Sequence, residues 1–219
     1  MIANWIARRR LKDPSYAFLF EPGQPDEAVS IDCETTGLDM RTDEIVSIAA
    51  VRVVGSRVLT SEAFHTTIRC ARTIDPQSIK VHGLRARAAA LGRAMADALP
   101  PLLQFIGGRT LVGYYLEFDV RMLNRYVRAW LGIDLPNPRT EVSSLYYDCK
   151  YGGASPGVNV DLSFASIARD LKLDLIDQHD ALADATTAAL MYVMLKDMKT
   201  RRARFARGPD AAAAGFPVG

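Results

Sequence analysis

The sequence has few of the residues that build disulfide scaffolds or zinc sites. Its 219 residues include three cysteines and three histidines. The cysteines, Cys33, Cys70 and Cys149, show no Cys-x-x-Cys spacing. An odd number of widely spaced cysteines argues against a disulfide framework and against structural zinc, and it indicates a reducing compartment. We interpret Cys33 as a small core residue.

Long hydrophobic runs are also missing. No apolar run reaches the ~18 residues that a membrane span needs. Residues 8–10 are three arginines, but no apolar segment and no Ala-x-Ala cleavage pattern follows them, so a signal peptide is not indicated. We therefore expect a cytoplasmic protein without membrane contact.

Acidic residues are scarce at both ends of the chain. Residues 1–12 carry four basic residues and no acid, and residues 196–219 carry six basic residues and two acids. Because the whole chain has a net charge of +2, the residues between carry a net charge of −6. An acidic body with basic ends suits a metal site with arms that contact phosphates. The alternative is that the basic ends only aid solubility.

The remaining composition, 49% hydrophobic with mixed charge, is that of an ordinary globular protein. The length fits one large domain, or one domain with extensions. Hydrophobic periodicity and turn residues predict a short amphipathic helix near the N-terminus, which Pro14 and the prolines after it end. They then predict strands at about 28–34, 44–54, 57–69 and 110–113, with a turn at Gly55-Ser56 between the second and the third. Helices are predicted at about 88–105 (interrupted by Pro100 and Pro101), 116–130, 141–149, 162–171 and 180–199, the last with Asp180 as its N-cap.

Two acids lie close together in the first strand. Asp32 and Glu34 are two residues apart, so in a strand their side chains point to the same face, while Ile31 and Cys33 point into a core. Like charges at that distance repel each other. A bound cation relieves the repulsion, and carboxylate oxygens are the ligands that Mg²⁺ prefers. The alternative is a surface strand with two solvated acids.

Two predicted helices each place an aspartate on their apolar stripe, Asp119 in the helix at 116–130 and Asp184 in the last helix. A buried, unpaired carboxylate is costly, so such acids are usually paired with a cation or bind a metal. Each could pair with a buried arginine. Together with Asp32 and Glu34, however, they form a set of four carboxylates that two divalent cations would balance.

His179 is the candidate base. It precedes Asp184 by five residues, so the two would not share a face of one helix. We therefore place His179 in the loop just before the last helix, where its imidazole can accept a proton from water near pH 7. The alternative is a solvated loop histidine.

Four segments of the chain contain the acids, His179 and a further histidine. Residues 32–39 read Asp-Cys-Glu-Thr-Thr-Gly-Leu-Asp, and residues 81–84 read Val-His-Gly-Leu. Residues 111–119 read Leu-Val-Gly-Tyr-Tyr-Leu-Glu-Phe-Asp, and residues 179–185 read His-Asp-Ala-Leu-Ala-Asp-Ala. In this order the segments resemble the DnaQ-like 3′–5′ exonucleases of the DEDDh group, including its His-Gly element at 81–84 and its His-x4-Asp spacing at 179–184. The resemblance covers about residues 28–198.

The resemblance implies an α/β, ribonuclease H-like fold, a mixed five-stranded sheet flanked by helices. It implies an exonuclease domain at 28–199 between an N-terminal extension (1–27) and a basic, disordered tail (200–219). It also implies that two Mg²⁺ or Mn²⁺ ions are held by Asp32, Glu34, Asp119 and Asp184. His179 would be the general base for attack of water on the terminal phosphodiester, releasing a nucleoside 5′-monophosphate. The residues implied in substrate binding are Thr35, Thr36, Gly37, Leu38, His82 and Tyr115.

The sequence departs from the family at Tyr114 and Tyr115, where the family usually has His-Asn. Tyr115 could instead stack on a base. The tail also has no evident Gln-x-x-Leu-Phe clamp-binding element. We expect action on 3′ ends of single-stranded DNA, with a DNA polymerase as a partner. The alternatives are an exoribonuclease of the same fold, similar to RNase T or oligoribonuclease, and a non-catalytic, polymerase-associated nucleic-acid-binding module.

Overall fold

The computed structural model describes residues 2–70, 91–152, 159–175, 179–203 and 205, with the backbone alone for residues 2 and 3. Five strands form one mixed sheet in the order β3-β2-β1-β4-β5. The central strand β1 (Glu27–Thr35) pairs antiparallel with β2 (Ile45–Val54), which pairs antiparallel with β3 (Arg57–Thr67). On its other side β1 pairs parallel with β4 (Thr110–Gly113), and β4 with β5 (Arg139–Glu141). The predicted mixed five-stranded sheet is confirmed.

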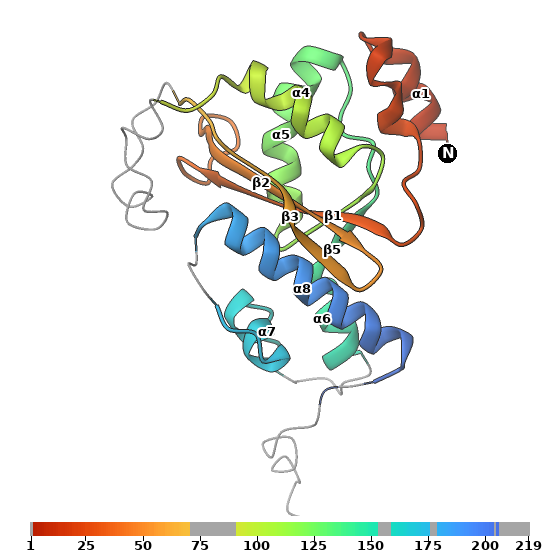
Figure 1. Ribbon diagram of the computed structural model, residues 1–219, viewed down its shortest axis with the longest axis vertical. Helices are drawn as coiled ribbons and strands as arrows, with labels where there is room; N and C mark the ends of the chain where they lie inside the picture. Colours follow the sequence, from red (N-terminus) through yellow and green to blue (C-terminus); the bar gives the residue numbers. More distant parts are fainter. Residues whose placement is uncertain (1, 71–90, 153–158, 176–178, 204, 206–219) are drawn as a thin grey trace, which may run out of the picture.

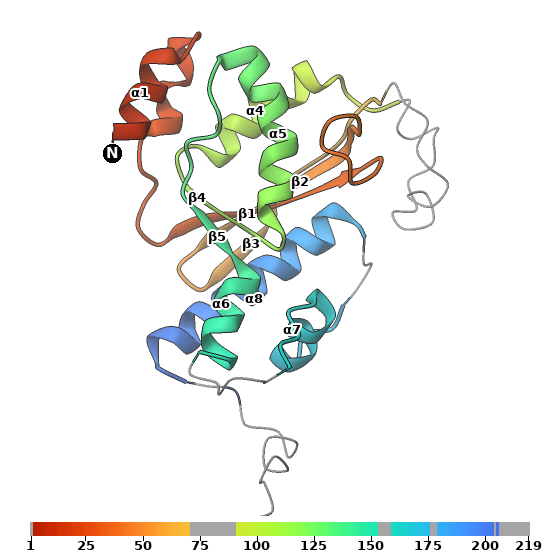
Figure 2. The same cartoon turned by 180° about the vertical axis from the view of Figure 1, so that it is seen from behind.

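Helices cover both faces of the sheet (Figures 1 and 2). On one side lie α1 (Ile2–Arg10), α4 (Met95–Ile106) and α5 (Leu116–Leu131). On the other lie α6 (Val142–Lys150), α7 (Phe164–Leu171) and α8 (Ala181–Thr200). Each side has its own core: Ile31, Leu103 and Leu123 belong to the first, and Val112 and Ile167 to the second. The α/β architecture is therefore a sheet between two helical layers.

The N-terminal segment packs onto the first of these layers. After α1 comes a 3-10 helix, η1 (Pro14–Phe20), whose residue Leu19 is buried in the core beside α5. The N–H of Lys12 donates to the carbonyl of Leu131 at 2.9 Å, which ties the segment to the end of α5. The short N-terminal helix that the sequence predicts is confirmed, and it ends at Arg10, before Pro14. Pro14 itself begins η1, since proline is tolerated at the first position of a helix, where its missing N–H has no partner to lose.

The prediction that Pro100 and Pro101 interrupt α4 was wrong, because α4 continues through both prolines. Pro101 has no N–H to donate to the carbonyl of Asp97 four residues earlier. The guanidinium of Arg93 donates to that carbonyl instead, at 3.1 Å. The helix also begins at Met95 rather than near residue 88, since residues 91–94 form a turn and a β-bridge. The elements η1 and β5 have no counterpart among the predicted ones, and the remaining strands and helices lie close to their predicted ranges.

Some expectations fall outside the described residues. They include the element Val81–Leu84 with His82, and the tail apart from residues 200–203 and 205. Within the described part of the chain, no helix has both the length and the hydrophobicity of a membrane span.

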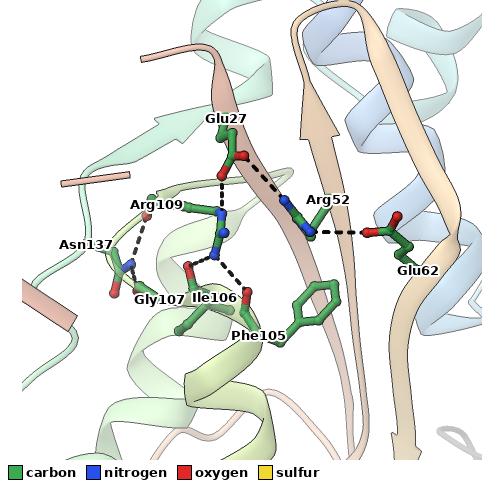
Figure 3. Close-up of polar contacts among 8 residues, drawn as sticks. All are labelled: Glu27, Arg52, Glu62, Phe105, Ile106, Gly107, Arg109 and Asn137. Carbon is green, nitrogen blue, oxygen red and sulfur yellow. Dashed lines mark hydrogen bonds and ion pairs between the residues drawn. The ribbon is translucent and has the colours of Figure 1, made fainter. Parts of the chain in front are cut away.

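The N-terminal end of β1 is held by a chain of ion pairs, drawn in Figure 3. The carboxylate of Glu27 accepts from Arg109 Nε at 2.6 Å and from Arg52 Nη2 at 3.3 Å. Arg52 also pairs with Glu62 of β3 at 3.1 Å. The hydrogen bond from Arg109 is the main cause that lowers the pKa of Glu27. This network joins β1, β2 and β3 to the residue that precedes β4.

Candidate active site

The opposite end of β1 carries Asp32 and Glu34. Ile31 and Cys33 belong to the core on the α4–α5 side, as predicted, so the two acids lie on the side of α8. Glu34 is buried, at 6% exposed, and Asp32 is half-buried. The pairing of β1 with β2 shifts between Glu34 and Thr35, which ends the regular strand just after the acids.

The first turn of α8 brings Asp184 to this strand end. Asp180 caps the helix as predicted, with its carboxylate accepting from the N–H groups of residues 182 and 183. Ala181 and Ala185 pack against the small and β-branched side chains of β2. Because alanine is small, the helix can approach the sheet closely at this point. Carboxylate oxygens of Asp32, Glu34 and Asp184 lie within 4.8 Å of one another.

Asp119 reaches the same strand end from the other helical layer. The pairing of β4 with β1 stops at Ser30, so it does not extend as far as Cys33. The N–H of Cys33 donates instead to Asp119 Oδ1 at 3.0 Å. Asp119 is buried, at 4% exposed, as its position on the apolar stripe of α5 predicts. It lies outside the group of three carboxylates but next to Asp32, whose pKa its charge raises.

The electrostatics of these acids fit a divalent cation site. Burial raises the pKa of Asp32 well above its usual range, and the charges of Asp119, Glu34 and Asp184 raise it further. Burial likewise raises the pKa values of Asp119 and Asp184. The hydrogen bonds from the N–H groups of Cys33 and His179 lower these two pKa values, but by less. In the described ranges, no lysine or arginine forms an ion pair with Asp32, Asp119 or Asp184. Crowded carboxylate oxygens with this excess of negative charge are suitable ligands for hard divalent cations.

His179 lies in a turn just before α8, as the sequence predicts. Its backbone has φ +68°, and its N–H donates to Asp184 Oδ2 at 3.0 Å. The side chain is exposed. The loop position therefore holds the histidine backbone directly against one acid of the site, while its role as a base stays a prediction.

The turn after β1 is built by its own side chains. Thr35 Oγ1 donates to the carbonyl of Gly37 at 2.7 Å, and Thr36 Oγ1 donates to Asp43 Oδ1 at 2.9 Å. A Cβ on Gly37 would lie 2.5 Å from Asp43 Oδ2, so only glycine allows this close approach. Leu38, at the tip, is 84% exposed. Contact of these four residues with a substrate stays a prediction.

Tyr115 stands directly before α5 in a left-handed conformation, with φ 54° and ψ 31°. For a residue other than glycine this conformation costs about 1–2 kcal/mol. Glu141 stabilises it, because its carboxylate accepts from the N–H of Tyr115 at 3.2 Å and of Leu116 at 2.9 Å. It also accepts from the N–H of Ser143 and so caps α6. The sequence predicts a helix that starts at Glu141, where an acid is a helix-start signal. Sequence reasoning missed the contact of this carboxylate with the N–H groups of Tyr115 and Leu116.

The fold is shared with solved exonuclease structures. Escherichia coli exonuclease I in complex with a dT13 oligonucleotide superposes with a TM-score of 0.68 at 18% identity. The match covers 81% of this chain and 42% of that chain. At this identity the likeness establishes the fold alone, and it confirms the predicted ribonuclease H-like architecture.

Sequence relatives are DNA polymerase III proteins. The chain is 30% identical over 168 residues to the DNA polymerase III subunit epsilon of Aquifex aeolicus, which covers 76% of this chain and 79% of that subunit. It is 29% identical over 170 residues to the PolC-type DNA polymerase III of Thermotoga maritima, of which it spans 12%. The sequence profile described as exonuclease matches residues 29–192, a range that includes all four acids and His179. The chain belongs to this exonuclease family, whose members are nuclease hydrolases, and the resemblance to DnaQ-like proteins is confirmed.

Proposed function

We propose that the chain is a divalent-metal-dependent 3′–5′ exonuclease. It would hydrolyse phosphodiester bonds from the 3′ end of single-stranded DNA and release nucleoside 5′-monophosphates, in proofreading or repair. The observation that supports this proposal most directly is the convergence of three carboxylates within 4.8 Å, from β1 and α8, beside a fourth from α5.

The four carboxylates of Asp32, Glu34, Asp119 and Asp184 would hold two Mg²⁺ or Mn²⁺ ions. When bound, such ions supply positive charge to the phosphoryl oxygens as charge develops on them. The N–H groups of Cys33 and His179 orient two of the carboxylates, since each donates to one of them. The carboxylates of Asp119 and Asp184 are therefore fixed by the backbone of β1 and of the turn before α8.

His179 would act as the general base, with its imidazole accepting a proton from the attacking water. Its turn permits this role, because the residue is exposed and its backbone N–H is bound to Asp184. The turn Thr35–Leu38 would receive the terminal nucleotide, with Leu38 against its base. His82 and Tyr115 are the other substrate contacts in this proposal.

The proposed partners follow from the relatives. The exonuclease I structure holds a DNA oligonucleotide, and the sequence relatives are polymerase III proteins. We infer DNA 3′ ends as the substrate and a DNA polymerase as a partner, in the cytoplasm. The exonuclease domain would span residues 28–199, with the extension at 1–27 and the basic tail at 200–219 at its ends.

A nuclease assay with 5′-labelled oligomers tests the proposal. Single-stranded DNA, mismatched duplex and RNA of one sequence would be compared with Mg²⁺, with Mn²⁺ and with EDTA. We expect a ladder that shortens from the 3′ end, abolished by EDTA. Asp32→Asn should lower the rate by about 10³-fold, because several kcal/mol of charge stabilisation is lost. Asp97→Asn, the same change at an exposed residue of α4, is the matched control.

Three outcomes would redirect the proposal. Equal rates of degradation by the wild type and Asp32→Asn would show that the acids take no part in hydrolysis. A large rate advantage on RNA would identify an exoribonuclease. Binding of the oligomers without any degradation would indicate the non-catalytic module.

A further inference from the structure

Two of the most exposed large apolar side chains flank the acids. Among the described residues, Leu38, Leu91 and Tyr115 have the highest exposures of this kind, at 84%, 79% and 72%. Leu38 follows the acids of β1, and Tyr115 precedes Asp119 by four residues. Exposed apolar surface gains nothing from folding, whereas a ligand that covers it gains the free energy of its burial. The exposed side chains of Leu38 and Tyr115, each four residues along the chain from an acid of the site, therefore point to a ligand.

The ring of Tyr115 is supported from one side. It lies against the ring of Tyr114, with centroids 4.7 Å apart and planes at 76°. Tyr114 is itself fixed, because its hydroxyl donates to the carbonyl of Leu162 at 3.1 Å and its ring packs on Phe164. The Tyr115 backbone is held by the carboxylate of Glu141. An exposed aromatic ring on such a support loses little conformational freedom when it binds a ligand.

The position of Tyr115 also suits a strand that ends at the acids. Four residues of helix separate it from Asp119, a rise of about 6 Å. The acids around Asp119 repel phosphates in the absence of cations, whereas stacking between an aromatic ring and a base requires no opposite charge. A nucleobase is thus the part of a nucleic acid that this ring can hold.

We propose that Tyr115 is a stacking platform for one unpaired nucleobase of the strand whose 3′ end is hydrolysed. The inference rests on the proposed function and deepens it. Stacking is tolerant of sequence, so Tyr115 would retain any single strand, with purines held better than pyrimidines at the stacked position. A paired base cannot be covered in this way, so the residue selects for single-stranded ends.

Two variants separate the ring from the backbone. Tyr115→Asn removes the ring, while asparagine tolerates the left-handed conformation of residue 115. Tyr115→Phe keeps the ring and removes the hydroxyl. We expect Tyr115→Asn to raise KM for single-stranded DNA by about 10-fold with little change in kcat, and Tyr115→Phe to behave as the wild type.

An abasic series identifies the stacked nucleotide. Oligomers with a single abasic site at each of the positions nearest the 3′ end would be assayed with both proteins. In the wild type, an abasic site at one of these positions should raise KM about 10-fold. In Tyr115→Asn, an abasic site at the same position should leave KM unchanged. A role of Tyr115 in folding alone would not produce this coupling. Identical abasic profiles in the two proteins would overturn the inference, while exonuclease activity sensitive to Asp32→Asn would still stand.

Binding provides a readout that does not require turnover. Binding of single-stranded DNA would be measured by fluorescence anisotropy with Asp32→Asn, alone and combined with Tyr115→Asn. The double variant should have a Kd about 10-fold higher. Equal Kd values in the two proteins, or no binding of single-stranded DNA to either, would also overturn the inference.

Discussion

The acidic side chains at the two ends of β1 have neighbours of opposite charge. At the N-terminal end, Glu27 lies between two guanidinium groups, and Arg109 lowers its pKa. At the C-terminal end, Asp32 lies among other carboxylates, and burial and their charges raise its pKa. The strand is the same, and only the partners differ. Carboxylates paired within the chain stabilise the fold, whereas crowded carboxylates such as Asp32 and Asp119, which form no ion pair with a lysine or arginine of the described residues, are suited to a bound cation.

This difference separates stability from chemistry. The ion pairs of Glu27, drawn in Figure 3, connect neighbouring strands and the residue before β4. They lie at the N-terminal end of β1, and Asp32 lies towards its C-terminal end. The acids at the other end are destabilising in the absence of a cation, since like charges repel and burial disfavours their charged forms. We therefore expect changes at one end to alter unfolding, and changes at the other to alter activity.

The largest expected effect is at the acidic end. His179→Ala should lower the rate of DNA hydrolysis by about 10²- to 10⁴-fold, because the proton acceptor is lost. Mg²⁺ affinity, measured by calorimetry, should stay nearly unchanged, since the backbone N–H that orients Asp184 remains. A large loss of metal affinity would show that the imidazole belongs to the metal site instead.

The next effect is on stability and its pH dependence. The pKa values of Asp32, Asp119 and Asp184 are raised in the folded protein. The folded state therefore binds more protons than the unfolded chain between the unfolded and folded pKa values, and stability falls as pH rises through that window. Asp32→Asn should raise the Tm of the metal-free protein more at about pH 8 than at about pH 5.

Calorimetric scans with EDTA and with Mg²⁺ measure this directly. Mg²⁺ at about 100 times its Kd should stabilise the wild type by about 2.7 kcal/mol. Asp32→Asn should lose much of that gain. If the Tm difference between the two metal-free proteins does not change with pH, the acids do not repel each other as described.

A smaller effect, on the free energy of unfolding, is expected at the N-terminal end of β1, where Glu27 is ion-paired. Arg109→Met leaves Glu27 with Arg52 alone, and both side chains of the lost pair are less than a quarter exposed. We expect a loss of about 2 kcal/mol in the free energy of unfolding, measured with urea, and no change in kcat. Arg121→Met is the control, since its pair with Glu117 is exposed and worth at most about 0.5 kcal/mol. Equal losses in the two variants would contradict the contrast between the ends of β1.

The smallest effect concerns an acid balanced by backbone rather than by a cation. Glu141 accepts N–H groups at the starts of α5 and α6. Glu141→Gln leaves one acceptor oxygen for both helices, so it should destabilise the fold by about 1 kcal/mol. Urea unfolding measures the loss, with Glu21→Gln, at an exposed residue directly after η1, as the control. An unchanged midpoint would mean that water replaces the carboxylate at these helix ends.

Local patterns predicted most of the elements. Alternation and the Gly55-Ser56 turn located β1, β2 and β3, and the capping residue Asp180 located the start of α8. The failures have local causes as well. The strand β5 has only three residues and follows Pro138, so no periodicity marks it. The continuous α4 depends on Arg93, whose contact with Asp97 no pattern indicates.

For the site, the sequence determined which acids the fold brings together. Asp32 and Glu34 share a strand face, and Asp119 and Asp184 lie on apolar stripes, because strand and helix periods fix the direction of each side chain. Tertiary structure decided how they meet. The alanines of α8 bring Asp184 to β1, and the end of β4 frees the Cys33 N–H for Asp119. It also decided the setting of Tyr115, which depends on Glu141, 26 residues away. Such contacts join distant parts of the chain, so no local pattern encodes them.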